Sequence, residues 1–232
     1  MKIVSLVHIG MVSLSAALLA GCARTPPGAT TGAQTLVTFE VQVAGQIVPG
    51  DPNAYYYIVL DTDNNPATGP IPVVARPWGN GYAAGSYTHY VLYHNGVFGV
   101  YESIDPNHTT STYLGRPLQG GITTTNRPND TLFVQVDRAQ IADIHPDVRA
   151  IDVNVISTDR VPLDPQELTV KVVDGLGASG NDYVTIPFGF TTVYTNGVDP
   201  DPAHPETPRD ADGLANNPNL DLINWRITVQ TQ

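Results

Sequence analysis

The strict alternation of apolar and polar residues that begins at Thr35 constrains the fold of this chain more than any other feature. Valine or phenylalanine occupies every second position over residues 37–43, and threonine, glutamate and glutamine lie between them. Successive side chains of an extended strand point to opposite faces, so this period of two predicts a strand with one buried and one solvated face. The chain therefore enters its folded part as β-structure.

Short strand-like runs and dense turn signals continue to the end of the chain. The runs predicted as strands are Val37–Val43, Tyr55–Leu60, Tyr87–Tyr93, Val97–Tyr101, Thr131–Val136, Ile151–Ser157, Leu168–Val173, Tyr183–Phe188 and Trp225–Val229. Asn95-Gly96 between two of these runs is a strong hairpin signal. A single helical turn is expected at Ala139–Ile144. Many short strands with glycine- and proline-rich turns predict an all-β fold, a single β-sandwich, with an irregular barrel as the alternative.

The N-terminus carries a signal for export. Lys2 precedes an apolar stretch from Ile3 to Leu19, which ends in the run Leu19-Ala20-Gly21-Cys22 with the only cysteine of the chain. This run resembles the lipobox of bacterial lipoproteins. The resemblance implies removal of residues 1–21 and attachment of acyl chains such as palmitate to Cys22. The alternatives are a transmembrane anchor or a buried helix, but the stretch is short for the roughly 20 residues that a span needs.

The rest of the chain divides into a tether and one domain. Residues 22–34 contain no large apolar residue and predict a flexible lipidated tether, whereas residues 35–232 contain all the predicted strands. Residue Ala23 stands where an aspartate would signal retention in the inner membrane of many Gram-negative bacteria. We therefore expect an extracytoplasmic protein anchored to the cell envelope, with the outer membrane favoured where there is one.

Charge excludes one class of partner. The chain has 22 acidic and 11 basic residues, and removal of residues 1–21 takes away Lys2, which leaves 11 − 1 = 10 basic residues. Such a surface repels nucleic acid phosphates and anionic lipid headgroups. We therefore expect no nucleic acid partner, and we expect attachment to the bilayer to depend on acylated Cys22.

Two acidic loops are candidate calcium sites. Asp61, Asp63 and Asn65 follow a predicted central strand at alternate positions, and Asp210 and Asp212 have the same spacing in a long polar segment at residues 195–222. Calcium prefers six to eight oxygen ligands, which such loops supply. The alternatives are Asx turns that cap backbone N–H groups in the first loop and a solvated loop in the second.

Aromatic residues gather on a glycine-rich stretch. Trp78, Tyr82 and Tyr87 lie among Gly79, Gly81 and Gly85. Exposed aromatic rings form flat apolar faces that can stack on sugar rings or on a partner's side chains. Aromatic residues near strands also commonly belong to the core, which is the alternative here.

The segment Tyr55–Gly69 resembles part of the family 9 carbohydrate-binding-module-like and DOMON-like groups of extracytoplasmic bacterial β-sandwich domains. The resemblance implies sugar or cofactor binding on a sandwich face, often with structural calcium. No methionine remains after residues 1–21 are removed, which argues against the haem-binding branch.

These observations lead to one functional expectation and two alternatives. We expect a non-catalytic ligand-binding domain, with carbohydrate as the ligand and Trp78, Tyr82 and Tyr87 as the contact. The first alternative is a structural or assembly lipoprotein that binds an envelope protein. The second is a polysaccharide hydrolase, since the separation of acid pairs is a property of the fold. The sequence contains no nucleophile elbow, phosphate loop or dinucleotide fingerprint, and no catalytic residue is assigned.

Overall fold

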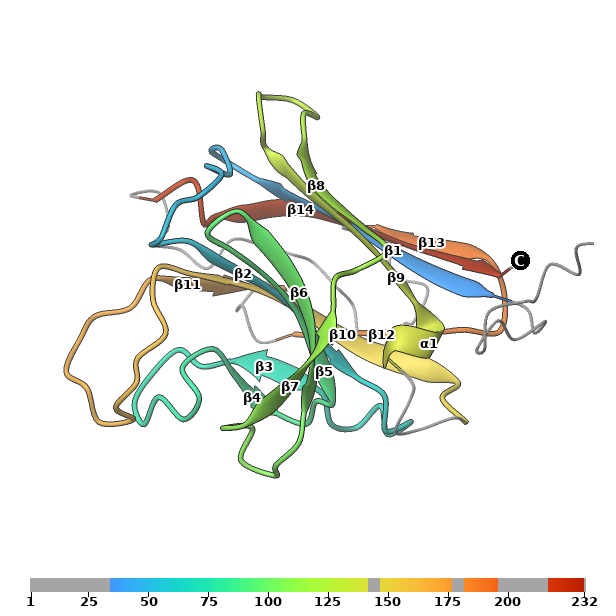
Figure 1. Cartoon of the computed structure of the whole chain (residues 1–232), viewed down its shortest axis with the longest axis horizontal. Helices are drawn as coiled ribbons and strands as arrows, with labels where there is room; N and C mark the ends of the chain where they lie inside the picture. Colours follow the sequence, from blue (N-terminus) through green and yellow to red (C-terminus); the bar gives the residue numbers. More distant parts are fainter. Residues whose placement is uncertain (1–33, 142–146, 177–181, 196–216, 232) are drawn as a thin grey trace, which may run out of the picture. The chain divides into compact units, whose positions relative to one another are not determined.

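The computed structural model describes residues 34–141, 147–176, 182–195 and 217–231. Two main antiparallel sheets contain most of the described strands, as Figure 1 shows. Both sheets have free edges within the described residues, so the all-β sandwich is confirmed and the barrel alternative does not apply.

The smaller main sheet has five strands in the order β13-β14-β1-β9-β8. Its strands are β1 (Thr35–Val43), β8 (Gln119–Thr123), β9 (Thr131–Asp137), β13 (Thr192–Thr195) and β14 (Leu222–Thr231). The alternating segment at residues 37–43 lies in β1, which pairs with β14 on one side and β9 on the other. Its central position explains the regular alternation, because one face of the strand packs into the core.

The larger sheet has the order β11-β10-β2-β5-β6-β7, and β12 also pairs with β10. Its strands are β2 (Tyr55–Asp61), β5 (His89–His94), β6 (Val97–Ser103), β7 (Ser111–Gly115), β10 (Ala150–Thr158), β11 (Val173–Gly175) and β12 (Val184–Pro187). Asn95 and Gly96 join β5 to β6 with φ angles of 49° and 79°, so the predicted hairpin is confirmed.

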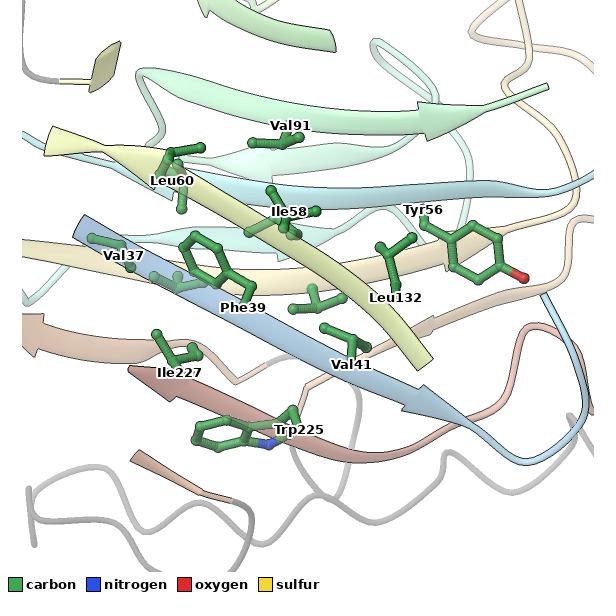
Figure 2. Close-up of a cluster of buried hydrophobic side chains, with 14 of the residues drawn as sticks. Val37, Phe39, Val41, Tyr56, Ile58, Leu60, Val91, Leu132, Trp225 and Ile227 are labelled. Carbon is green, nitrogen blue, oxygen red and sulfur yellow. The ribbon is translucent and has the colours of Figure 1, made fainter. Parts of the chain in front are cut away.

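The core lies between the two sheets. Figure 2 shows Val37 and Phe39 of β1, with Ile227 of β14, facing Ile58 and Leu60 of β2. These five side chains are at most 1% exposed. Burial of apolar area on this scale is the main stabilising contribution in a domain without disulfides.

A third layer covers the outer face of the larger sheet. The β3–β4 ribbon (Pro70–Pro72 and Ala83–Gly85) belongs to it, and a second apolar cluster joins this layer to the sheet. Alternation along β2 divides its side chains: Ile58 belongs to the main core, whereas Tyr57 and Val59 belong to the second cluster. The near-continuous apolar run of β2 is therefore explained, because both faces of this strand are covered.

One predicted strand and one predicted helix differ from the structure. The run Leu168–Val173 is not a strand, because β11 begins only at Val173 and residues 159–172 connect β10 to it. Leu168 and Val170 are exposed in this connection. The helical turn is shorter than expected, at α1 (Arg138–Ile141), and residues 142–146 lie outside the described residues.

The strand directions define two ends of the domain. At one end Thr35 of β1 pairs with Thr231 of β14, and at the other Val43 pairs with Leu222. We call the second end the far end. The connection from β1 to β2 lies there, since Ala44 and Gly45 donate hydrogen bonds to the carbonyls of Asp221 and Pro218. The β5–β6 turn and the β8–β9 loop lie at the same end: a Cβ at Gly96 would meet Gly50, and the N–H of Ile47 bonds the carbonyl of Asn129.

Candidate functional site

The aromatic residues predicted to form an exposed contact lie in the interior. Trp78, Tyr82 and Tyr87 are 5%, 8% and 3% exposed. The Tyr82 ring stacks on Tyr57 with centroids 4.2 Å apart, and the Tyr87 hydroxyl donates to the Tyr82 hydroxyl at 3.1 Å. The expected exposure of these rings is therefore wrong. The physical reason is that the outer face of β2 and β5 is itself aromatic and apolar, so the glycine-rich stretch folds over it as a cover.

The Trp78 side chain helps to hold this third layer together. Its indole N–H donates to the carbonyl of Glu167 at 2.8 Å, which fastens residues 159–172 to residues 73–82. The Lys171 ammonium donates to the carbonyls of Val73 and Gly81 and lies 5.5 Å from the Trp78 ring. Burial lowers the pKa of Lys171 to about 8, although the Asp159 carboxylate acts in the opposite direction. The polar atoms of both side chains are thus used inside the domain.

The first acidic loop is a series of Asx turns. Asp61 accepts from the N–H of Asp63, Asp63 from that of Asn65, and Asn65 from that of Ala67, at 3.2, 2.7 and 3.3 Å. The alternate spacing that suggested calcium therefore serves the backbone, because each side chain caps the N–H group two residues ahead. This use does not occupy all the oxygen atoms of the loop.

Asp61 is the one buried residue among the three predicted calcium ligands of this loop. It is 1% exposed, and its Oδ2 atom has no hydrogen-bond partner among the described residues. Asp152 lies directly opposite it on β10, is also buried, and accepts a hydrogen bond from the Thr185 hydroxyl. Burial raises the pKa of Asp61, while the Ser86 hydroxyl acts against this rise. The described residues contain no group of three or more His, Cys, Asp or Glu placed to hold a metal ion. Calcium binding stays a prediction.

Three predicted site residues cannot be placed. Cys22, Asp210 and Asp212 lie outside the described residues. Within the described ranges, none of the helices has the length and apolar character that crossing a membrane requires.

A cavity that begins at the far end and runs along β8 toward the other end of the domain unites residues that the sequence did not point to. It has a volume of about 770 Å³ and lies between the β5–β6 hairpin and strand β8. We call it the far-end groove. The residues that line it are Pro49, Tyr93, Gly96, Val97, Phe98, Arg116, Pro117, Leu118, Gln119, Gly120, Gly121, Ile122 and Asn129. Its volume is within the range of ligand sites in proteins, about 300–1,000 Å³.

The groove follows the edge of β8. Four consecutive residues of this strand, Gln119 to Ile122, line it, although neighbouring side chains of a strand point to opposite faces. A cavity that touches all four must therefore reach the strand from its edge. Among the described strands β8 pairs only with β9, so its other edge is free (Figure 1).

The walls of the groove combine apolar side chains with polar surface in similar amounts. Val97 and Leu118 are 56% and 49% exposed. The Phe98 ring packs against the backbone of Gly120, where a Cβ would come within 3.0 Å of the ring. Arg116 is exposed at the rim and forms no ion pair with any described residue. The groove can thus accept an apolar group together with a negative charge.

The sequence signal for this site is weak. Gln119-Gly120-Gly121-Ile122-Thr123 contains a single large apolar residue, and glycine is poor in strands. The segment was therefore not predicted as a strand. This segment becomes recognisable as a strand only when the neighbouring β9 strand has been recognised.

Comparisons with known proteins assign no family. No protein-family model, curated protein or solved structure matches this chain. The site must therefore be judged on its own geometry.

Proposed function

We propose that this protein is a lipid-anchored envelope protein whose β-sandwich binds another envelope protein, without catalysis, through the far-end groove. The observation that carries this proposal is the groove itself, a cavity with both apolar and polar walls along a strand edge that is unpaired within the described residues. Exposed apolar surface with a polar rim is typical of interaction sites. The Trp78–Tyr87 segment, which was expected to bind a ligand, has no part in this proposal because its rings are buried.

Anchoring has its own test. Metabolic labelling with a palmitate analogue should tag the wild-type protein in its host and should not tag Cys22→Ala. Equal labelling of both would rule out the lipidated cysteine and leave the groove proposal standing alone.

The partner proposal is tested by position-specific photo-crosslinking in living cells. A photoreactive amino acid at position 121, in the groove, should capture a defined envelope protein, and one at position 189 should not. Gly121 and Gly189 are matched sites, since a Cβ at either meets no atom within 4 Å and neither has a positive φ. The captured protein is then purified and its Kd measured against the full chain.

The next test is whether binding of the captured partner requires an open groove. Gly121→Trp fills the groove and should weaken the binding of the purified partner by about tenfold or more, as loss of a central interface contact does. Gly189→Trp should leave the Kd unchanged. Equal affinity of wild type and Gly121→Trp would refute the proposal.

A glycan remains the second candidate ligand, at a different place from the one expected. Tyr113 on the edge strand β7 is 55% exposed and lies beside Tyr101, with ring centroids 5.4 Å apart. An exposed ring of this kind can stack on a sugar. A glycan array probed with the full chain, with Tyr113→Ala as the control, tests this candidate. Loss of a glycan signal in Tyr113→Ala but not in Gly121→Trp would favour it over the protein partner.

A further inference from the structure

Strand β8 is an edge strand without the usual protection. Natural edge strands are commonly guarded by lysine, proline, a bulge or a covering loop. The edge strand of the other sheet at the same side, β7, is guarded in this way, because its pairing shifts at Val100/Tyr101 and Gly115 has a φ of 124°. Residues Gln119–Thr123 of β8 include no charged residue and no proline. An unguarded edge is a template for pairing with a further strand.

The two glycines of β8 make its backbone accessible. Gly121 carries no side chain and a Cβ there would meet nothing within 4 Å, while Gly120 is backed by the Phe98 ring. Peptide groups in such a strand are open to a partner from the groove. Each unpaired backbone N–H or C=O is a strong hydrogen-bonding group, and an extended chain is the ligand that satisfies a whole row of them.

The apolar side chains of the groove and the Arg116 guanidinium favour certain ligand sequences over others. Val97, Phe98 and Leu118 line the groove, so they are available for contact with apolar side chains of an added strand. Arg116 stands just before β8 in an otherwise acidic protein, and its guanidinium can pair with a carboxylate in two parallel hydrogen bonds. The preferred ligand is therefore an extended segment with apolar residues at alternate positions and an acidic group at one end.

We propose that the far-end groove binds an extended polypeptide segment of the partner, which pairs with the free edge of β8 as a sixth strand of the five-stranded sheet. This inference rests on the proposed function, because it names how the partner occupies the groove. The five residues of β8 span about 17 Å at about 3.4 Å each, so about five residues of the partner take part.

The probe for this proposal is a synthetic peptide with the sequence of β9, Thr131–Asp137. This sequence already pairs with β8 in the domain, alternates apolar residues at Leu132, Val134 and Val136, and ends in an acid. Fluorescence anisotropy with the full chain in detergent should give a saturable Kd. Amide hydrogen exchange of residues 119–123 should slow in the complex, because their free N–H groups become bonded.

N-methylation separates strand pairing from other modes of binding. One peptide is methylated at the backbone nitrogens of Leu132, Val134 and Val136, and the other at those of Phe133 and Gln135. Only one of the two rows of N–H groups of an edge strand faces its neighbour. We expect one methylated peptide to lose about tenfold or more in affinity, the loss of several hydrogen bonds, and the other to bind like the parent.

Each outcome is decisive. Equal binding by both methylated peptides, loss of binding by both, or no binding of the parent peptide would overturn strand addition. These failures leave the proposed function intact if the cross-linked partner still requires an open groove at Gly121. If Gly121→Trp binds that partner normally, the proposed function fails as well.

Discussion

Two glycine-rich segments of this domain use glycine in opposite ways. In residues 79–85, Gly79, Gly81 and Gly85 all have positive φ angles, so the chain turns sharply and folds its aromatic neighbours onto the larger sheet. In β8, Gly120 and Gly121 have no positive φ and lie in a regular strand. There glycine removes side chains and leaves the backbone accessible. The comparison teaches that glycine beside aromatic residues can serve burial, whereas glycine in an edge strand can serve recognition.

The largest expected effect tests the structural role of the first segment. Tyr82→Ala removes a buried ring that stacks on Tyr57 and should lower the free energy of unfolding by about 3–5 kcal/mol, as buried aromatic truncations do. In a domain of this size the melting temperature should fall by about 10 °C. Thermal denaturation followed by near-UV circular dichroism measures this change.

Tyr113→Ala is the matched control for Tyr82→Ala. Tyr113 is 55% exposed, so its loss should cost less than about 1 kcal/mol, in the range of surface substitutions. Equal destabilisation by the two substitutions would contradict the assignment of Tyr82 to a packed third layer. It would also reopen the Trp78–Tyr87 segment as a contact surface.

The second expected effect concerns the loop that supports the far-end groove. Asp130 accepts hydrogen bonds from the N–H groups of Thr125, Asn126 and Arg127 and from the Gln42 amide, all at 2.8 Å. Asp130→Asn places an N–H group against these donors and should cost about 3 kcal/mol, since hydrogen bonds to a charged group are lost. Urea denaturation at neutral pH measures the loss, with Asp137→Asn at the half-buried end of β9 as the control.

The role of the Asp130 carboxylate can also be tested through the pH dependence of stability. Burial raises the pKa of Asp130, but the N–H groups of Thr125 and Asn126 and the Gln42 amide outweigh burial and hold this pKa well below its usual range. The contribution of Asp130 is therefore fully present above the unfolded pKa of about 3.9 and is lost as pH falls through the folded pKa. Wild type should lose stability over this acid range more steeply than Asp130→Asn. Parallel stability curves for the two proteins would show that the pKa of Asp130 is not lowered in the folded state.

A smaller effect is expected from calcium at the first acidic loop. If Asp61, Asp63 and Asn65 bind calcium, millimolar calcium should raise the melting temperature and a chelator should lower it. The stabilisation is about 2.7 kcal/mol at a hundredfold excess over Kd. Asp61→Asn should abolish the response. It should also stabilise the calcium-free protein near neutral pH, because burial raises the pKa of Asp61 and makes its charged form unfavourable in the folded state.

The sequence predicted the sheets better than the site, for physical reasons. Alternation in β1 and the continuous apolar run of β2 report burial directly, so these strands were found with nearly correct ends. Burial of Trp78 and Tyr82 depends on which face of the larger sheet needs a cover, and this is a property of the tertiary structure. The alternating residues 168–173 were wrongly predicted as a strand. They lie in a connection that hydrogen bonds of Trp78 and Lys171 hold in place.

The groove escaped prediction because its recognition elements are backbone atoms. Residue types report side-chain chemistry, and β8 offers little: two glycines, a glutamine, an isoleucine and a threonine. Its free edge depends on which strands pair with it, and the neighbouring wall comes from Val97 and Phe98 of another sheet. Long-range pairing of this kind leaves no local signature in a single sequence.

The smallest expected effect separates the two uses of glycine most directly. Gly121→Ala should change the free energy of unfolding by less than about 1 kcal/mol, because a Cβ there meets no atom and the φ angle is ordinary. Gly81→Ala should be far more destabilising, since Gly81 has a φ of 89° and a Cβ would lie 2.7 Å from Val161. Equilibrium unfolding of both variants compares them under one condition. A large loss for Gly121→Ala would mean that this glycine is required for folding, and the open edge of β8 would then need no partner to explain it.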